Sequence, residues 1–418
     1  MSVTRFTYFR ILLRLRRLIR NDHLILVILA IVAGTAAGAA VIGFRETISF
    51  IQLALYGSDS EHLFTNTEAV AWWQILLAPV AGGLVVGVLV RYLMPEGRTQ
   101  GVADVIEASA LKGGWMSSRV GLTAAVVSAV SIGAGASVGR EGPAVHLGAS
   151  LSGWIGRRLH LTRSLTRTLL GCGVASAVAA SFNAPIAGAL FASEVVIGHY
   201  ALKAFAPIVI ASVAGTAISQ AWFGDFPAFS LGETYLASFW EFPAFASLGV
   251  AAGITAIGFM KAIELARRFA KDTPVPVWLK PAGAGLMVGL IGLLFPQVMG
   301  VGYGVTEQAL LVTLPLALLV VLALAKILAT ALSIGGGVFS PSLVIGALIG
   351  GAYGIIATSI FPAYSSGPAA YTVVGMGAMA AAVLGAPIST TLIVFEMTGD
   401  YALTLAVMVA VVIASEIT

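Results

Sequence analysis

Charged residues are scarce in this sequence of 418 residues, and cysteine is almost absent. Asp, Glu, Lys and Arg make up 10% of the chain, whereas 58% of the residues are hydrophobic and the mean hydropathy is +0.97. Because water cannot be the solvent for most of such a surface, the composition excludes a soluble globular protein. The single cysteine, Cys172, excludes an intrachain disulfide and a cysteine-based metal cage.

The sequence also lacks the alternating segments of about 10 residues that a membrane β-barrel needs. Apolar runs of about 20 residues recur instead, which is the length of a helix that crosses a bilayer. We therefore expect an all-α integral membrane protein that is surrounded by the lipid bilayer.

Basic residues are unevenly distributed, since Lys and Arg are absent after Lys326. Several arginines precede the first apolar run: Arg5, Arg10, Arg14, Arg16, Arg17 and Arg20. By the positive-inside rule, we expect a plasma (inner) membrane protein with a cytoplasmic N-terminus. Residues 1–22 are interpreted as a basic amphipathic helix on that surface, with a disordered basic tail as the alternative. This clustering means that the net charge of +4 does not indicate a nucleic-acid partner.

The apolar runs predict two membrane halves, residues 23–220 and 241–418, joined by a linker over residues 221–240. Expected helices of the first half are 24–55, 71–93, 101–111, 120–132, 144–155, 165–180 and 186–197. Those of the second half are 242–269, 278–294, a short one near Thr306, 316–332, 342–360, 370–384, 388–397 and 401–414. Many are too short to cross a core of about 30 Å upright, so we expect half-helices or oblique helices.

The two halves share a pattern. Glu194 follows Pro185 of Asn-Ala-Pro-Ile by nine residues, and Glu396 follows Pro387 of Gly-Ala-Pro-Ile by nine residues. These prolines are 202 residues apart, and the prolines of the GREGP and GGVFSP motifs are 198 apart. Interrupted segments at matching places of two halves are typical of transporters whose binding site lies at the membrane midplane.

The stretch from Gly133 to Gly148, GAGASVGREGPAVHLG, carries the adjacent charges of Arg140 and Glu141 between apolar runs. Charged groups at membrane depth are costly and usually mark an ion or proton path. An ionised Glu141 carboxylate would occupy an anion site formed by neighbouring amides and would leave it on protonation. The alternative is an ion pair between Arg140 and Glu141 that only supports the fold.

Three motifs place Gly or Pro just before an apolar helix: GREGPAV at 139–145, GGVFSPSL at 336–343, and the turn that ends in Gln100 and Gly101. Glycine lets backbone amides approach a ligand closely, and a helix N-terminus is a ready anion site. We expect these ends to bind an anion together. Close helix packing is the alternative for any single glycine.

These motifs, the Asn-Ala-Pro stretch and a tyrosine after a Glu-Met-Thr segment resemble the ClC family of chloride channels and proton-coupled chloride exchangers, over about residues 24–418. The resemblance implies an inverted-repeat helical domain, a homodimer with one pore per subunit, bound chloride and no cofactor. It also implies that Glu141 is the gating glutamate. The anion-binding residues implied are Gln100, Gly101, Arg140, Gly142, Val338, Phe339, Ser340 and Tyr401.

The first departure from the family pattern is Gln100, which stands where the family typically has the serine of a GSGIP motif. The side-chain amide of Gln100 can donate to an anion, but it is bulkier than a hydroxyl and also presents an acceptor. The preferred anion is therefore left open.

The second departure is Val195, which follows Glu194 where many exchangers have a second glutamate that relays protons. A valine is common in the channels of the family, although some exchangers also lack the second glutamate. His199 would share the face of Val195 if the helix continued, so we consider it a candidate proton relay beside Glu194. The alternative is an interfacial histidine.

We interpret the protein as a transporter of chloride and similar small anions and favour proton-coupled exchange gated by Glu141. A passive chloride channel is the alternative. A remote alternative is an intramembrane serine hydrolase, because residues 135–139 match G-x-S-x-G around Ser137. That pattern needs a strand, a turn, a helix and a nearby histidine base, and the surrounding sequence predicts no strand. We therefore expect no enzyme activity.

Overall fold

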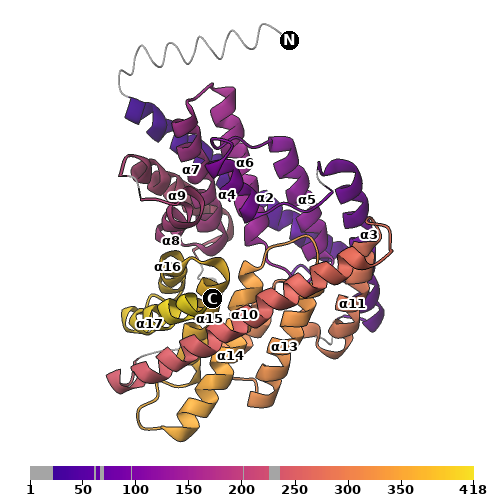
Figure 1. Cartoon of the computed structure of the whole chain (residues 1–418), viewed down its shortest axis with the longest axis vertical. Coiled ribbons are helices and arrows are strands. Elements are labelled where there is room, and N and C mark those ends of the chain that lie inside the picture. The colour runs from indigo at the N-terminus through magenta and orange to yellow at the C-terminus, as the bar shows by residue number, and fades with distance from the viewer. Residues whose placement is uncertain (1–21, 61–62, 66–69, 96, 201, 226–235) are drawn as a thin grey trace. The chain divides into compact units, whose positions relative to one another are not determined.

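The computed structural model describes the chain except for residues 1–21, 61–62, 66–69, 96, 201 and 226–235. Nearly all of the predicted N-terminal helix, residues 1–22, and the centre of the predicted linker, residues 221–240, lie outside the described residues. Within the described residues the protein is helical, apart from turns and one isolated β-bridge (Figure 1). The all-α prediction is confirmed.

In chain order, the described helices fall into two series that are divided at the segment 226–235 (Figure 1). The first series contains α2 (Asp22–Tyr56), α3 (Trp72–Leu93), α4 (Val102–Ala110), α5 (Ser118–Gly133), α6 (Glu141–Arg158), α7 (Arg163–Phe182), α8 (Pro185–Phe191), the π-helical turn η2 (Ala192–Ile197) and α9 (Leu202–Phe223). The second contains η3 (Phe239–Glu241), α10 (Phe242–Asp272), α11 (Lys280–Leu294), η4 (Pro296–Val298), α12 (Tyr303–Leu310), α13 (Leu316–Leu332), α14 (Phe339–Ile360), α15 (Pro368–Leu384), α16 (Pro387–Thr398) and α17 (Tyr401–Ile417).

The turn before Pro185 in the first series and the turn before Pro387 in the second have nearly the same backbone conformation. Asn183 has φ 56° and ψ 37°, and Gly385 has φ 62° and ψ 36°. The next residues, Ala184 and Ala386, have φ −129° and −131°. Each turn therefore ends one helix in the left-handed region and starts the next helix on a proline, a position where proline loses no hydrogen bond. The predicted repeat of the fold is present in the local geometry.

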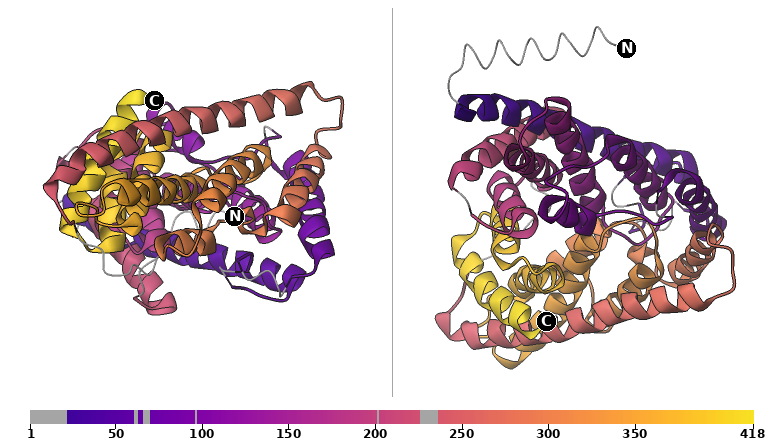
Figure 2. Two further views of the ribbon diagram at one scale, coloured as in Figure 1. Left: turned by 90° about the horizontal axis from the view of Figure 1, so that it is seen from below. Right: turned by 45° about the horizontal axis from the view of Figure 1, so that its top comes forward.

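By their contacts the residues form two compact, interleaved units. The first unit comprises residues 1–43, 100–125 and 144–226, and the second comprises 44–99, 126–143 and 227–418. The limits of the two predicted sequence halves therefore stay a prediction. In the first unit, α7 is almost wholly buried and packs against α8 and α9. In the second, α14 packs against α13 and α15, and the long α10 lies along α15 and α17 (Figure 2).

Among the described residues, six helices are long and apolar enough to cross a membrane. Shorter helices were also expected, and α4 and α12 have only 9 and 8 residues. The expected helices did not include α9, which carries Pro207 in its second turn. A proline within the first two turns removes only one backbone hydrogen bond, so the apolar stretch still forms a helix.

The starts of α6 and α14 also differ from the expectation. They begin at Glu141 and Phe339, whereas the sequence analysis began these helices at residues 144 and 342. The reason is that the prolines of both motifs fit inside the first helical turn rather than before it. Glu141 is therefore part of a helix N-terminus.

Close glycine contacts between α14 and α15 generate a prediction about stability. A Cβ on Gly375 would lie 2.4 Å from the carbonyl oxygen of Gly346, whereas a Cβ on Gly258 in α10 would meet no atom within 4 Å. Gly375→Ala should therefore lower the melting temperature of the purified protein. Gly258→Ala should raise it slightly, because alanine favours a helix by about 0.5–1 kcal/mol over glycine. Equal melting temperatures for the two variants would contradict this packing.

Candidate anion site

Two glycine-rich loops of the second unit pair with each other directly before α6 and α14. The amide of Gly139 donates to the carbonyl oxygen of Gly337 at 2.7 Å, and the amide of Gly337 donates back to Gly139 at 2.9 Å. A Cβ on Gly139 would lie 2.8 Å from Oε2 of Glu141 and 3.0 Å from the backbone nitrogen of Ser340. A larger residue would therefore separate the loops, and the pairing brings the first turns of α6 and α14 together.

The Glu141 carboxylate lies at the N-terminus of α14. Its Oε2 accepts a hydrogen bond from the hydroxyl of Ser340, the second residue of α14, and its Oε1 accepts one from the hydroxyl of Tyr303 at 3.0 Å. The Glu141 side chain is 4% exposed. The first amides of a helix have no intrahelical acceptor, and that end of the helix carries partial positive charge. The carboxylate thus occupies a position that suits an anion.

Arg140 is the nearest cation to this carboxylate among the printed contacts. Its Nε lies 3.9 Å from Oε1 of Glu141, and its guanidinium carbon lies 4.8 Å from the ring centroid of Tyr303. The ion pair that the sequence analysis weighed is therefore present, but this Nε distance is too long for a hydrogen bond. The two hydroxyl groups hold the carboxylate, and Arg140 adds a nearby positive charge.

Tyr303 is a residue of this site that the sequence analysis did not identify. It starts the short helix α12, and Gly302 before it has φ 96°. The loop before it is fixed by the buried Lys326, whose ammonium donates to the carbonyl oxygens of Val298 at 3.0 Å and Gly300 at 2.9 Å. The only hint in the sequence was a hydroxyl-bearing aromatic residue between glycines at the start of a short helix.

The other predicted residues of the second motif lie beside Glu141. Val338 precedes α14, Phe339 is its first residue, and Ser340 contacts the carboxylate. A Cβ on Gly337 would lie 3.2 Å from the backbone nitrogen of Gly142, so Gly142 also borders the paired loops. The structure brings these four residues together with Glu141. Their binding of an anion stays a prediction.

Gln100 and Gly101 belong to the first unit, directly before α4. The backbone amide of Gly101 donates to Oδ2 of Asp104 at 2.8 Å. This amide is thus engaged in capping its own helix, which leaves the side chain of Gln100 as the more suitable donor of the two. The role of Gln100 stays a prediction.

Tyr401 is the first residue of α17, and its side chain is 72% exposed. The contacts of α17 are with α10, α15 and α16, whereas the partners of Glu141 come from α12 and α14. The role of the Tyr401 hydroxyl stays a prediction.

The proposed helical relationship between Val195 and His199 is wrong. The π-helical turn that contains Glu194 and Val195 ends at Ile197, because Gly198 adopts φ 76°. His199 is exposed beyond this end and does not continue the helix face. Burial and, secondly, the charge of the half-buried Glu194 raise the pKa of the nearby Tyr200.

The G-x-S-x-G stretch does not form a nucleophile elbow. Ser137 lies in the turn between α5 and α6, and its buried hydroxyl lies 3.2 Å from the hydroxyl of Thr330. Its amide donates to the hydroxyl of Ser333 at 3.0 Å. These contacts tie the turn to the end of α13, so Ser137 has a structural role.

Known proteins match nearly the whole chain. The family model described as voltage gated chloride channel matches residues 82–418. A putative chloride channel protein ClcB-like from Ralstonia nicotianae is 35% identical over 385 residues and aligns with 90% of each chain. The voltage-gated ClC-type chloride channel ClcB from Escherichia coli O17:K52:H18 is 31% identical, with 93% of this chain and 94% of that protein aligned.

Solved structures share the fold. A slow cyanobacterial Cl⁻/H⁺ antiporter has a TM-score of 0.83 at 23% identity, covering 94% of this chain and 93% of its own. A CLC-type fluoride/proton antiporter has a TM-score of 0.77 at 20% identity, covering 94% of each chain. With the inverted-repeat fold and the family match, the hydrolase alternative is excluded. The protein belongs to the voltage gated chloride channel family and is a ClC-type membrane transport protein, not an enzyme.

Proposed function

We propose that this protein exchanges chloride for protons across the membrane, with Glu141 as both gate and proton carrier. The observation that supports this is the position of its carboxylate at the N-terminus of α14, where Ser340 and Tyr303 donate to it. An ionised carboxylate there excludes a diffusing anion, because both need the same donors and repel each other. Protonation of Glu141 removes that charge, so its side chain leaves the site. Chloride then accepts hydrogen bonds from the same donors.

Chloride in this site would be held by partial charges and not by a direct Lys or Arg contact. The amides at the start of α14, from Val338 to Ser340, and the hydroxyl of Ser340 are suitable donors. Gln100 is proposed to add a side-chain donor. Such donors offset dehydration of the anion but still allow its release, which conduction requires. The proposal needs no cofactor.

Passive conduction is the second candidate, and Val195 favours it. A valine cannot carry a proton between Glu141 and the cytoplasm, and Glu194 is half-buried beside it. The names of similar proteins include both candidate functions. The two relatives from Ralstonia nicotianae and Escherichia coli are described as chloride channels, whereas two solved structures are described as proton antiporters. We favour exchange because the chain keeps the glutamate of the GREGP motif, Glu141. Its carboxylate also accepts hydrogen bonds in the way that a bound anion would.

We further propose a homodimer in the plasma (inner) membrane with the N-terminus in the cytoplasm. The arginines before α2 support this orientation by the positive-inside rule. Since α2 is long enough to cross the membrane, its C-terminal end would then face the opposite side. Homodimerisation follows from the resemblance to the ClC family.

Glu141→Gln is the variant that tests the gate. In liposomes with a chloride gradient, the unaltered protein should drive protons uphill, because the carboxylate carries them. The variant should still move chloride, while its proton flux falls to that of empty liposomes. Passive conduction predicts no uphill proton movement in the unaltered protein. Proton coupling that persists in Glu141→Gln would contradict the role of Glu141.

Tyr303→Phe removes one donor to the carboxylate but keeps the ring that Arg140 contacts. A hydrogen bond to a charged group contributes about 1.5–3 kcal/mol, so the gate should open more readily and chloride flux at neutral pH should rise several-fold. The difference should disappear at acid pH, where protonated Glu141 no longer needs the donor.

Tyr92→Phe provides the matched control, because it removes the hydroxyl of an exposed tyrosine of α3 that belongs to neither the predicted nor the described site. Its chloride flux should equal that of the unaltered protein at both pH values. If Tyr303→Phe behaves in the same way as this control, the hydroxyl of Tyr303 has no part in gating.

His199→Ala tests the corrected proton-relay hypothesis. Because His199 lies beyond the helix end and is exposed, the ratio of chloride to protons moved should not change. Simultaneous chloride and proton recordings from liposomes measure this ratio. A loss of protons relative to chloride would restore His199 as a relay.

A further inference from the structure

The connection between α6 and α7 is a tight turn. The amide of Leu161 donates to the carbonyl oxygen of Gly156 at 3.0 Å. The amide of His160, which has φ 53°, donates to the carbonyl oxygen of Arg157 at 3.1 Å. These two hydrogen bonds form a Schellman motif, which ends a helix in a defined way. Because the hydroxyl of Thr162 then caps the start of α7, the backbone on both sides of the turn is fixed.

This part of the sequence is strongly basic. No Asp or Glu stands between Glu141 and Glu194. Four arginines stand in the same stretch: Arg157, Arg158, Arg163 and Arg167. Arg157 and Arg163 are exposed, and within the described part of the chain neither forms an ion pair with an acidic side chain. Their positive charge is therefore available to a partner from outside the chain.

The loop after α4 packs against both helices beside the turn. A Cβ on Gly153 in α6 would lie 2.7 Å from the carbonyl oxygen of Gly114. A Cβ on Gly114 would lie 2.9 Å from the Cα of Arg167 in α7. The next residue of the loop is Trp115, and the guanidinium carbon of Arg157 lies 4.4 Å from the centroid of its ring. A cation is attracted to an aromatic face, so Trp115 holds Arg157 at this surface.

Arg163 lies along the same loop. Its Cγ would be 3.1 Å from a Cβ on Gly113, so its aliphatic stem packs on the loop backbone. Lys112, the preceding loop residue, is paired with Glu107 at 2.8 Å and adds little net charge. The positive charge of this surface therefore comes from the arginines of α6 and α7.

Exposed aromatic side chains lie beside these arginines. Trp115 is 42% exposed, and Trp154 of α6 is 45% exposed. Arg158 follows Trp154 by four residues, so the two side chains share one helix face. We name Trp115, Trp154, Arg157, Arg158 and Arg163 the turn surface. Its combination of tryptophan rings and positive charge is typical of the headgroup region of a membrane.

The turn surface lies outside the hydrocarbon core of the bilayer, because exposed arginines are too costly within it. The length of α6 agrees with this placement, since its 18 residues span about 27 Å of a core that is about 30 Å thick. By the positive-inside rule, a basic turn between membrane helices faces the cytoplasm. Anionic lipids give the cytoplasmic leaflet a negative surface potential, which is complementary to this turn.

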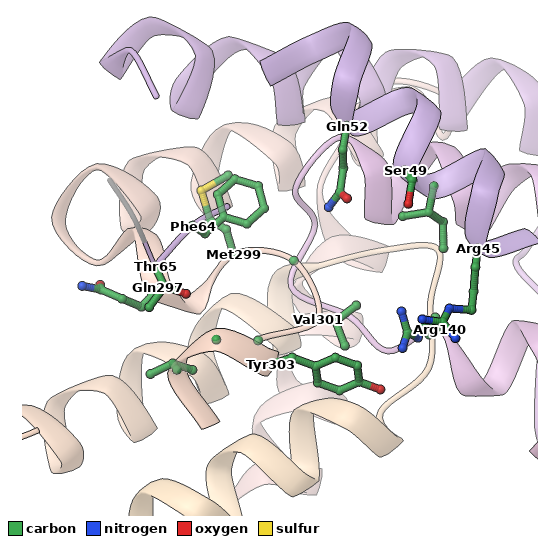
Figure 3. A pocket seen from close by; sticks show the side chains of 15 residues that line it. Arg45, Ser49, Gln52, Phe64, Thr65, Arg140, Gln297, Met299, Val301 and Tyr303 are labelled. Atoms are coloured by element: carbon green, nitrogen blue, oxygen red, sulfur yellow. The ribbon is translucent and has the colours of Figure 1, made fainter. Parts of the chain in front are cut away.

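We propose that the turn surface binds the headgroup of an anionic phospholipid in the cytoplasmic leaflet. A guanidinium group donates paired hydrogen bonds to phosphate oxygens, and tryptophan rings prefer the level of the headgroups. The site is distinct from the cavity beside Arg140 and Tyr303 (Figure 3), because the turn surface contributes no residue to the lining of that cavity. The inference requires a protein embedded in a bilayer but not chloride transport, so it is independent of the proposed function.

A lipid fits the turn surface better than a free anion or another segment of the chain. A free phosphate ion would neutralise the arginines but would leave Trp115 and Trp154 without an apolar partner. The segment before α2 carries six arginines, so like charges would repel it. A phospholipid supplies the negative charge and the apolar contact together.

The first test measures tryptophan quenching in phosphatidylcholine vesicles with a small, equal fraction of brominated phosphatidylglycerol or brominated phosphatidylcholine. Bromine on an acyl chain quenches tryptophans that it contacts. Brominated phosphatidylglycerol should quench the unaltered protein more strongly, and this excess should be lost in Trp115→Phe/Trp154→Phe. The control Trp72→Phe/Trp73→Phe, which changes two exposed tryptophans of α3, should keep the excess. No excess in the unaltered protein, or an excess that survives Trp115→Phe/Trp154→Phe, would overturn the inference.

The second test removes the positive charge. In Arg157→Gln/Arg163→Gln, the excess quenching by brominated phosphatidylglycerol should fall several-fold. It should stay in Arg91→Gln/Arg267→Gln, which removes the same charge from exposed arginines of α3 and α10. An unchanged excess in Arg157→Gln/Arg163→Gln, or an equal loss in both variants, would overturn the inference. Displacement of the brominated lipid by inorganic phosphate would show a site for a free anion and contradict the lipid. The tryptophan variants decide the question if Arg157→Gln/Arg163→Gln does not fold.

Discussion

A carboxylate held away from water needs hydrogen-bond donors and nearby positive charge, because a buried ion otherwise costs several kcal/mol. The Glu141 carboxylate obtains both at the first turn of α14, from Ser340, Tyr303 and the helix N-terminus. The paired loops at Gly139 and Gly337 make this arrangement possible, since side chains there would push the two helix starts apart. The account of gating depends on these hydrogen bonds to the Glu141 carboxylate.

The repeated fold explains how two helix N-termini can meet inside a membrane protein. A continuous membrane helix satisfies its own backbone groups, so it offers no amide donors at mid-depth. The broken segments of the two series provide such ends, and α6 and α14 begin at matching motifs. Lys326 supports this arrangement indirectly, because its ammonium fixes the carbonyl groups of the loop that presents Tyr303. The buried amino group of Lys326 is thus hydrogen-bonded to backbone oxygens beside the site.

Much of this could be predicted from the sequence. Apolar runs located most helices, with α13 at the expected limits of Leu316–Leu332, and the two motifs identified Glu141 and Ser340. Tyr303 could not be found, because its contact with Glu141 joins residues 162 positions apart and leaves no local pattern. The helix expected over residues 186–197 does end at Ile197, so the continuation to His199 that a shared face with Val195 required is absent, since the left-handed conformation of Gly198 ends the helix.

The central claim is that the Glu141 carboxylate and chloride compete for the same donors. Binding linkage then requires that chloride favours the protonated form of Glu141, so that chloride binding takes up protons. The most direct measurement is the proton uptake from a weakly buffered solution of the purified protein when chloride replaces an anion too large for the site. The account predicts uptake by the unaltered protein and none by the Glu141→Gln variant. Chloride binding without proton uptake in the unaltered protein would contradict it.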